Sequence, residues 1–248
     1  PEEKIGYGDV RTAAQVYDFL SPRIVLASKS PQRIDLLQQI VSSKKIEVQV
    51  STCDEENVSK EDPFERGKRL AAAKAKDIFN LRKYNDRAEF IIGADTEIIR
   101  QDEKGQWKMV GHPDNADQAE KDLLNLNGKT HLAITGIAII GRDPKTKKVV
   151  MKTDCVRTSV TFADNEASQI RVYAQSGEPI DRAGAYAIQG LGNFLIKEID
   201  GSYSNVVGLP LERVSEILAV DFARPIWMFD KVSRWNFSDP IKGEDLQE

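Results

Sequence analysis

Apolar positions along this chain recur with two spacings, one typical of strands and one typical of helices. The run Ile24–Ala27 is short, wholly apolar and followed by polar residues, which predicts a buried strand. Behind it, the apolar residues from Ile34 to Ile40 recur at helical spacing, which predicts an amphipathic helix. Strand-like and helix-like segments then alternate, so the sequence predicts an α/β fold with a largely mixed sheet.

The predicted elements are separated by charged or glycine-containing stretches that read as turns. The predicted strands lie near Ile24–Ala27, Glu47–Ser51, Phe90–Gly93, Glu97–Arg100, His131–Ile140, Thr153–Phe162 and Phe194–Ile199. The predicted helices lie near Pro31–Val41, Pro63–Asn80, Asn115–Leu126, Asn165–Gln175 and Leu209–Val220. The predicted surface turns are Arg82–Glu89, Asp102–Trp107 and Arg142–Lys148.

The two ends of the chain differ from the part between them. Residues 1–22 mix glycine, proline and charge, and predict an N-terminal extension with one helix near Ala13–Leu20. Residues 23–220 carry the alternating pattern and form the predicted domain. Residues 221–248 place aromatic residues among prolines and charges. This tail has two interpretations, a strap packed on the domain's own apolar surface or a contact between two copies of the chain.

Composition narrows the class of protein. The 248 residues carry 35 Lys and Arg against 39 Asp and Glu, a net charge of −4, which argues against general nucleic-acid binding. No apolar run approaches the roughly 20 residues of a membrane span, and the N-terminal residues show no apolar signal core. Only Cys53 and Cys155 are present, too few for a zinc site or a disulfide framework. These features predict a soluble, cytoplasmic protein with reduced thiols.

The turn after Ile24–Ala27 is a candidate phosphate site. Ser30 and Pro31 form a predicted helix N-cap and first helical residue, which leaves backbone N–H groups free at the helix start. Ser28, Ser30 and Arg33 add two hydroxyls and a cation at the same point. A capped turn without any ligand is the alternative.

Asp95 lies between two strongly apolar segments, directly after Gly93 and Ala94. An unpaired buried carboxylate is costly, so Asp95 should either accept hydrogen bonds from a turn or face a cleft that holds a metal ion or a water molecule. Thr96 could orient a substrate oxygen or be an ordinary strand threonine. Glu97 is expected to alternate outward.

Two further charged residues have open interpretations. Glu55, within an acidic stretch, lies in a solvated loop or folds back toward Asp95, where the two carboxylates would bind a hard divalent cation. Lys74 lies on an alanine-rich helix and either extends to solvent or reaches a phosphate.

The segment Glu178–Gly192 is rich in glycine and alanine and contains Arg182 and Gln189. The amide of Gln189 offers a donor and an acceptor, as reading the edge of a nucleobase requires. A turn amide that binds its own backbone is the alternative.

Several familiar chemistries lack their motifs. The two histidines, His112 and His131, lie in no HExxH motif or nucleophile elbow, and neither GxGxxG nor GxxxxGK[ST] occurs. What remains is metal-assisted chemistry on a phosphate ester or anhydride.

Taken together, these segments resemble the Maf family, nucleoside triphosphate pyrophosphatases also called septum-formation-inhibitor-like proteins. The resemblance runs from about Ile24 to about Leu218. Its motifs are Leu26-Ala27-Ser28-Lys29-Ser30-Pro31-Gln32-Arg33, Gly93-Ala94-Asp95-Thr96, Gly111-His112-Pro113, Asn127-Gly128-Lys129-Thr130-His131 with Thr135-Gly136, Ala183-Gly184-Ala185-Tyr186 with Gln189-Gly190, and Val206-Val207-Gly208-Leu209-Pro210.

The resemblance implies an elongated sheet flanked by helices, with two lobes around a central cleft, similar to the inosine triphosphate pyrophosphatases. It also implies a homodimer and cleavage between the α and β phosphates of a nucleoside triphosphate with Mg²⁺ or Mn²⁺. The implied catalytic and metal residues are Asp95 as general base, Glu55 at the metal or water, and the helix lysine Lys74. The implied substrate-binding residues are Ser28, Ser30, Gln32, Arg33, Thr96, Arg182 and Gln189.

The chain departs from the family pattern at three cations. Gln32 stands where a first arginine is usual, His112 where Gly-Lys-Pro is frequent, and Arg182 where lysine is common. Gln189 before Gly190 resembles the branch that acts on dTTP and UTP. The branch that acts on 7-methyl-GTP tends to carry glutamate there. We therefore expect pyrimidine triphosphates, including CTP and modified ones, as substrates, and a non-catalytic nucleotide-binding regulator of cell division as the rival function.

Overall fold

The computed structural model describes residues 21–53, 61–81 and 88–224. Four sequence predictions lie wholly or mostly outside this part of the chain: the helix at Ala13–Leu20, the position of Glu55, the turn at Arg82–Glu89 and the packing of the aromatic tail. Among the described residues, no helix is long and apolar enough to cross a membrane.

One seven-stranded sheet organises the molecule, in the order β2-β1-β3-β5-β6-β7, with β4 paired to β3. Its strands are β1 Ile24–Ala27, β2 Ile46–Val48, β3 Phe90–Gln101, β4 Trp107–Val110, β5 Thr130–Arg142, β6 Val149–Phe162 and β7 Ile196–Asp200. β1 is parallel to β2 and β3, and the other pairs are antiparallel. The mixed α/β sheet predicted from the sequence is confirmed.

The described α-helices are α2 Pro31–Gln38, α3 Pro63–Asn80, α5 Ala116–Leu126, α6 Ala167–Gln175, α7 Tyr203–Val207 and α8 Leu211–Glu216, which continues as a π-helix over Ile217–Asp221. Except for α8, these helices begin at residues whose side chains cap them. The Asp62 carboxylate accepts the N–H groups of Phe64 and Glu65 at the start of α3. Asn115 caps α5 in the same way.

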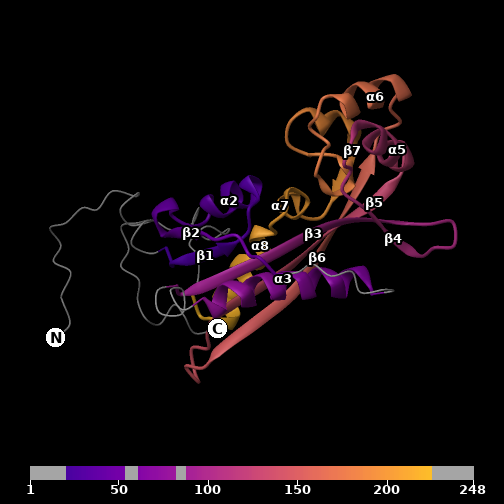
Figure 1. Ribbon diagram of the computed structural model, residues 1–248. Coiled ribbons are helices and arrows are strands. Elements are labelled where there is room, and N and C mark those ends of the chain that lie inside the picture. The colour runs from indigo at the N-terminus through magenta and orange to yellow at the C-terminus, as the bar shows by residue number, and fades with distance from the viewer. Residues whose placement is uncertain (1–20, 54–60, 82–87, 225–248) are drawn as a thin grey trace, which may run out of the picture.

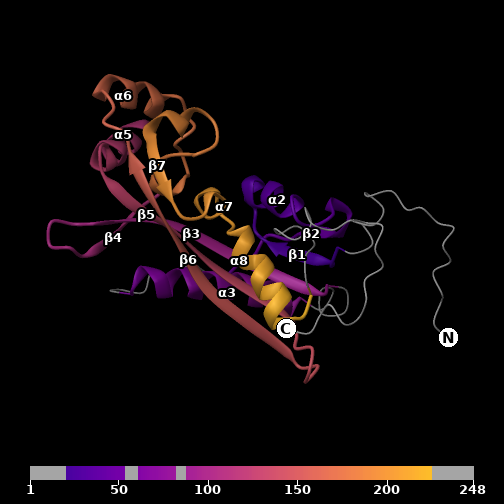
Figure 2. The ribbon, with the colours of Figure 1, turned by 180° about the vertical axis from the view of Figure 1, so that it is seen from behind.

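The sheet is covered on both faces. α2 and α8 pack with β1 and β3 in one apolar core, and α3 packs on the opposite face with small residues such as Ala71 and Ala75. α3 runs along the sheet in Figure 1, and α8 crosses in front of it in the reverse view of Figure 2. A separate core joins α5 and α6 to the far ends of β5 and β6. The cores on the two faces of the sheet form one lobe, and the core of α5 and α6 forms the other.

Two glycines allow α3 to lie directly on the sheet. A Cβ at Gly93 would lie 2.2 Å from the carbonyl oxygen of Ala71, and one at Gly136 would lie 2.0 Å from that of Gly67. Neither contact is sterically permitted, so this helix–sheet distance requires glycine at both strand positions.

The central strand β3 is longer than predicted. The separate strands predicted at Phe90–Gly93 and Glu97–Arg100 are one strand, because β5 pairs with it continuously from Ile91 to Ile99. β4 and α7 were not predicted. On its other edge, β3 pairs with β1 as far as Gly93 and with β4 from Ile98 onward. Residues 94–97 therefore have an edge that neither β1 nor β4 covers.

Candidate active site

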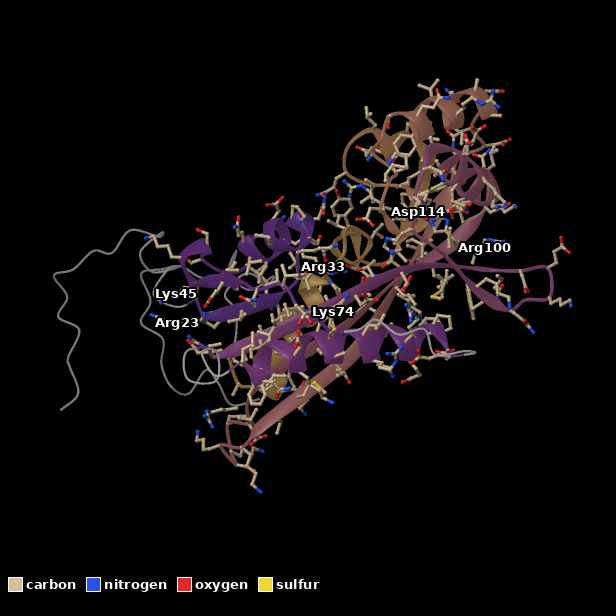
Figure 3. All side chains as sticks on the ribbon, in the orientation of Figure 1. Arg23, Arg33, Lys45, Lys74, Arg100 and Asp114 are labelled. Carbon is tan, nitrogen blue, oxygen red and sulfur yellow. The ribbon has the colours of Figure 1, made fainter. Side chains whose placement is uncertain are left out.

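A cleft of about 930 Å³ opens at this uncovered edge of β3. Its volume is in the range of about 300–1,000 Å³ that is typical of small-molecule sites. The cleft is lined by every predicted site residue in the described part of the chain, namely Ser28, Ser30, Gln32, Arg33, Lys74, Asp95, Thr96, Arg182 and Gln189. Figure 3 labels two of them, Arg33 and Lys74, close to the middle of β3.

The turn between β1 and α2 has the predicted capped geometry. The Ser30 hydroxyl accepts the N–H of Arg33, and Pro31 is the first helical residue. The Ser30 hydroxyl also donates to the side-chain oxygen of Gln32 at 3.1 Å, and the Ser28 hydroxyl accepts the N–H of Ser30 at 3.2 Å. These hydroxyls hold the start of α2 open toward the cleft, where an anion would meet its positive end.

Arg33 joins three segments of the chain at the cleft wall. Its Nη1 donates to Ser28 Oγ at 3.2 Å, its Nη2 to Thr96 Oγ1 at 2.9 Å, and its Nε to the carbonyl oxygen of Gly208 at 2.8 Å. Thr96 Oγ1 also lies 3.0 Å from Thr135 Oγ1. Thr96 therefore orients Arg33, a role that neither interpretation from the sequence included.

Lys74 and Asp95 form an ion pair between α3 and β3. Lys74 Nζ lies 2.6 Å from Asp95 Oδ1, and the side chains are 14% and 10% exposed. Lys74 therefore does not extend to solvent. The second oxygen of Asp95, Oδ2, accepts no hydrogen bond from the described residues. Asp95 thus has a cation at one oxygen and space for a water molecule or a ligand at the other.

Glu97 lines the same cleft, which the sequence analysis missed. The prediction that it points outward is wrong, since the residue is buried and its Oε1 lies 3.3 Å from Arg66 Nε. Burial and the charge of Asp95 raise the pKa of the Glu97 carboxyl, and Arg66 offsets part of that shift. The signal was available, because residues two apart on a strand share one face.

Arg182 and Gln189 belong to the loop at the far side of the cleft. The Glu178 carboxylate accepts the N–H groups of Leu191 and Gly192 at 3.1 and 2.9 Å and so holds the loop in place. Arg182 Nε donates to the carbonyl oxygen of Glu178 at 3.0 Å. Gln189 is exposed, and its amide has no hydrogen bond to a described residue. The alternative in which this amide binds its own backbone is therefore wrong.

A buried aromatic cluster supports this loop from behind. His131 Nε2 lies 2.9 Å from the hydroxyl of Tyr186, whose ring borders the cleft. Burial lowers the pKa of His131 to about 4, so the imidazole is neutral at physiological pH. Burial also raises the pKa of Tyr186 well above its usual range. The pair is uncharged and positions the cleft wall.

The described residues contain no group of three or more His, Cys, Asp or Glu side chains placed to hold a metal ion. Asp95, with one oxygen not engaged by Lys74, offers the oxygen ligand that Mg²⁺ or Mn²⁺ prefers. Mg²⁺ is commonly bound by one or two carboxylates together with substrate phosphates, so this donor set fits a metal that arrives with a nucleotide.

Comparison with known proteins finds relatives that carry the same name. Two bacterial proteins named dTTP/UTP pyrophosphatase are similar to the chain. The one from Geotalea uraniireducens is 42% identical over 195 residues, 79% of this chain and 93% of the relative. The one from Syntrophus aciditrophicus is 39% identical over 199 residues, 80% of this chain and 90% of the relative.

A crystal structure of a nucleoside-triphosphatase/dITP/XTP pyrophosphatase from Mycobacterium abscessus is similar at 14% identity and a TM-score of 0.35, and the match covers 81% of this chain and 94% of that one. A TM-score this low supports no argument of its own. The family model described as Maf-like protein matches residues 23–220, a span that contains every residue of the cleft. The chain belongs to the family of Maf-like proteins.

Proposed function

We propose that this protein is a pyrophosphatase that hydrolyses the α–β phosphoanhydride of pyrimidine nucleoside triphosphates and so clears them from the nucleotide pool. Its expected substrates are dTTP, UTP, CTP and modified pyrimidine triphosphates. The observation that carries the proposal is the Lys74–Asp95 pair, which faces the same cleft as Ser28 and Arg33. The names of the two bacterial relatives support it.

The cleft provides a group for each step of this hydrolysis. The Asp95 oxygen that Lys74 does not bind takes a proton from a water molecule, and the water oxygen attacks one phosphorus of the α–β anhydride. The P–O bond to the bridging oxygen breaks, which yields a nucleoside monophosphate and pyrophosphate. Arg33 and the start of α2 stabilise the negative charge that develops on the phosphate oxygens, and Lys74 holds the Asp95 carboxylate in position.

We propose that Mg²⁺ or Mn²⁺ enters with the substrate. Asp95 is the described residue that would hold it, through the water molecule that it deprotonates, and Glu55 is the predicted second ligand. When bound, the metal would polarise the phosphate oxygens. The homodimer and the cytoplasmic location remain predictions.

Gln189 supports a pyrimidine as the base. Its amide faces the cleft without a hydrogen bond to a described residue, so its donor and acceptor are available to the edge of a base. The hydrogen bonds from Leu191 N and Gly192 N to the Glu178 carboxylate fix the backbone on the C-terminal side of Gln189. Binding therefore requires little ordering of the loop.

The test is release of pyrophosphate in the presence of Mg²⁺ from a panel of nucleoside triphosphates, for the parent protein and for Asp95→Asn. We expect release from UTP and dTTP, and at least a hundredfold lower kcat in Asp95→Asn, because the general base is lost. If only 7-methyl-GTP were hydrolysed, the protein would belong to the branch of the family that acts on that nucleotide. Nucleotide binding without pyrophosphate release by either protein would replace the enzyme with a nucleotide-binding regulator.

A further inference from the structure

A second ion pair lies in the cleft, and the proposed hydrolysis leaves it without a role. Glu97 and Arg66 meet at 3.3 Å, with side chains 8% and 11% exposed, and both line the cleft. Glu97 follows Asp95 on the face of β3 that is turned toward α3. A buried ion pair is weak evidence for stability, because desolvation offsets much of the attraction between the charges. The position of this pair in a binding cleft therefore calls for another explanation.

Glu97 has one carboxylate oxygen to spare. Oε1 binds Arg66, whereas Oε2 accepts no hydrogen bond from the described residues. Oε2 is not among the fully buried polar atoms of the described residues that lack a partner. It is therefore exposed, on the cleft that Glu97 lines. An ionised carboxylate only accepts hydrogen bonds. Phosphate oxygens are acceptors as well, so they cannot donate a hydrogen bond to Glu97. Glu97 is suited to accept a hydrogen bond from a hydroxyl or an N–H group of a ligand.

The position of Glu97 along β3 identifies which part of a nucleotide it meets. At one side, Gly93 pairs with Ala27, where the phosphate-binding turn begins. At the other side, His112 lines the cleft together with Glu97, and its Nδ1 lies 3.2 Å from the carbonyl oxygen of Asp181, in the loop that leads to Gln189. Glu97 lies between these two ends. In a nucleoside triphosphate, the part between the phosphates and the base is the sugar.

We infer that Glu97 is a specificity-determining residue that accepts a hydrogen bond from a sugar hydroxyl of the bound nucleotide. This inference rests on the proposed function, since it takes the cleft to hold a nucleoside triphosphate. Arg66 holds the carboxylate in place and offsets the cost of burying a second negative charge beside Asp95. Carboxylates of other nucleotide-binding folds contact ribose hydroxyls in the same chemical manner.

The test compares UTP with 2′-deoxy-UTP and 3′-deoxy-UTP, which share the base and the triphosphate. For the parent protein we expect kcat/KM about tenfold to a hundredfold lower for one of the deoxy analogues, as for loss of a hydrogen bond to a charged group. In Glu97→Leu we expect the kcat/KM values of the three substrates to become similar, mainly through a higher KM for UTP. Glu97→Gln keeps an uncharged acceptor and should give an intermediate ratio, which carries the test if the leucine variant does not fold.

The matched control is Glu61→Gln. It weakens the Arg69–Glu61 pair, which lies at the same helix but does not line the cleft, and should leave the ratio between substrates unchanged. Equal kcat/KM values for the three substrates in the parent protein would overturn the inference. So would a ratio that persists in both Glu97 variants, or a change in Mg²⁺ requirement in place of a change in that ratio.

Calorimetric binding of the same three nucleotides separates this inference from the proposed function. If the parent protein binds UTP more tightly than a deoxy analogue, and Glu97→Leu removes the difference, Glu97 reads the sugar even if no pyrophosphate is released. If pyrophosphate is released but no sugar preference exists, the hydrolysis stands and the role of Glu97 does not.

Discussion

At the scale of single residues, geometry matters as much as charge in this cleft. Arg33 carries the charge expected of a phosphate ligand, but its planar fork also connects the turn between β1 and α2 to Thr96 and Gly208. A lysine keeps the charge and cannot make these divergent contacts from one group.

Arg33→Lys should therefore lower kcat/KM for UTP at least tenfold and reduce the melting temperature. The physical reason is that Thr96 and the carbonyl of Gly208 lose their shared donor. Steady-state kinetics and thermal melts check both effects, with Arg23→Lys on the exposed surface as the control. Parental kcat/KM in Arg33→Lys would show that charge alone suffices.

His131 makes stability depend on pH. Its pKa is lowered from 6.5 in the unfolded chain to about 4 by burial. The unfolded state therefore binds the extra proton between these values, and stability, fully present above about pH 6.5, falls as the pH drops toward 4. By pH 5 this group should cost roughly 2 kcal/mol.

Urea unfolding of the parent protein and of His131→Gln at pH 7 and pH 5 measures this contribution. The other titrating groups act in both proteins, so the loss of unfolding free energy between the two pH values should be smaller in the variant by roughly 2 kcal/mol. Equal losses in the two proteins would contradict a buried neutral imidazole.

At the scale of elements, the contact between α3 and the sheet positions the ion pairs of the cleft. α3 carries Lys74 and Arg66, and β3 carries their partners Asp95 and Glu97. The helix comes close enough because Gly136, the partner of Asp95 across β3 and β5, has no side chain under it. A side chain at residue 136 would push α3, with Arg66 and Lys74, away from the sheet.

Gly136→Ala should destabilise the protein by about 3 kcal/mol and lower activity, because its Cβ would lie 2.0 Å from the carbonyl oxygen of Gly67. Gly67→Ala is the matched control on the helix side. Its Cβ would lie 3.4 Å from the backbone nitrogen of Gly136, an ordinary contact, and alanine favours helix over glycine by about 1 kcal/mol. Urea unfolding compares the two, and equal effects would contradict this account of the packing.

At the scale of the whole molecule, residues of both lobes line the cleft. The turn between β1 and α2 belongs to one lobe, and Gln189 belongs to the lobe of α5 and α6. A nucleotide bound along the cleft would touch both lobes, and its binding free energy would add to the stability of the folded chain.

A non-hydrolysable α,β-methylene analogue of UTP at about a hundred times its Kd should add about 2.7 kcal/mol and raise the melting temperature by about 5–10 °C. Uridine and tripolyphosphate each reach one end of the cleft, so each should give a smaller shift at the same concentration. Differential scanning fluorimetry compares the three ligands. A shift with tripolyphosphate that equals the shift with the full analogue would contradict a site shared by both lobes.

The sequence by itself determined what depends on neighbouring residues. Ser30 and Pro31 specify the start of α2 through local hydrogen bonding and a restricted backbone, and the motif around Asp95 identified the family's chemistry. The residue types of the site could therefore be predicted, and those within the described part of the chain all line one cleft.

Only the tertiary structure decided what depends on pairing between distant segments. Continuous pairing with β5 carries β3 through Asp95, and the ends of β1 and β4 leave the edge at residues 94–97 uncovered by either strand. The approach of α3 turned Glu97 from an expected outward residue into the partner of Arg66. The periodicity of one strand shows which side chains share a face, but burial and charge pairing depend on which element covers that face.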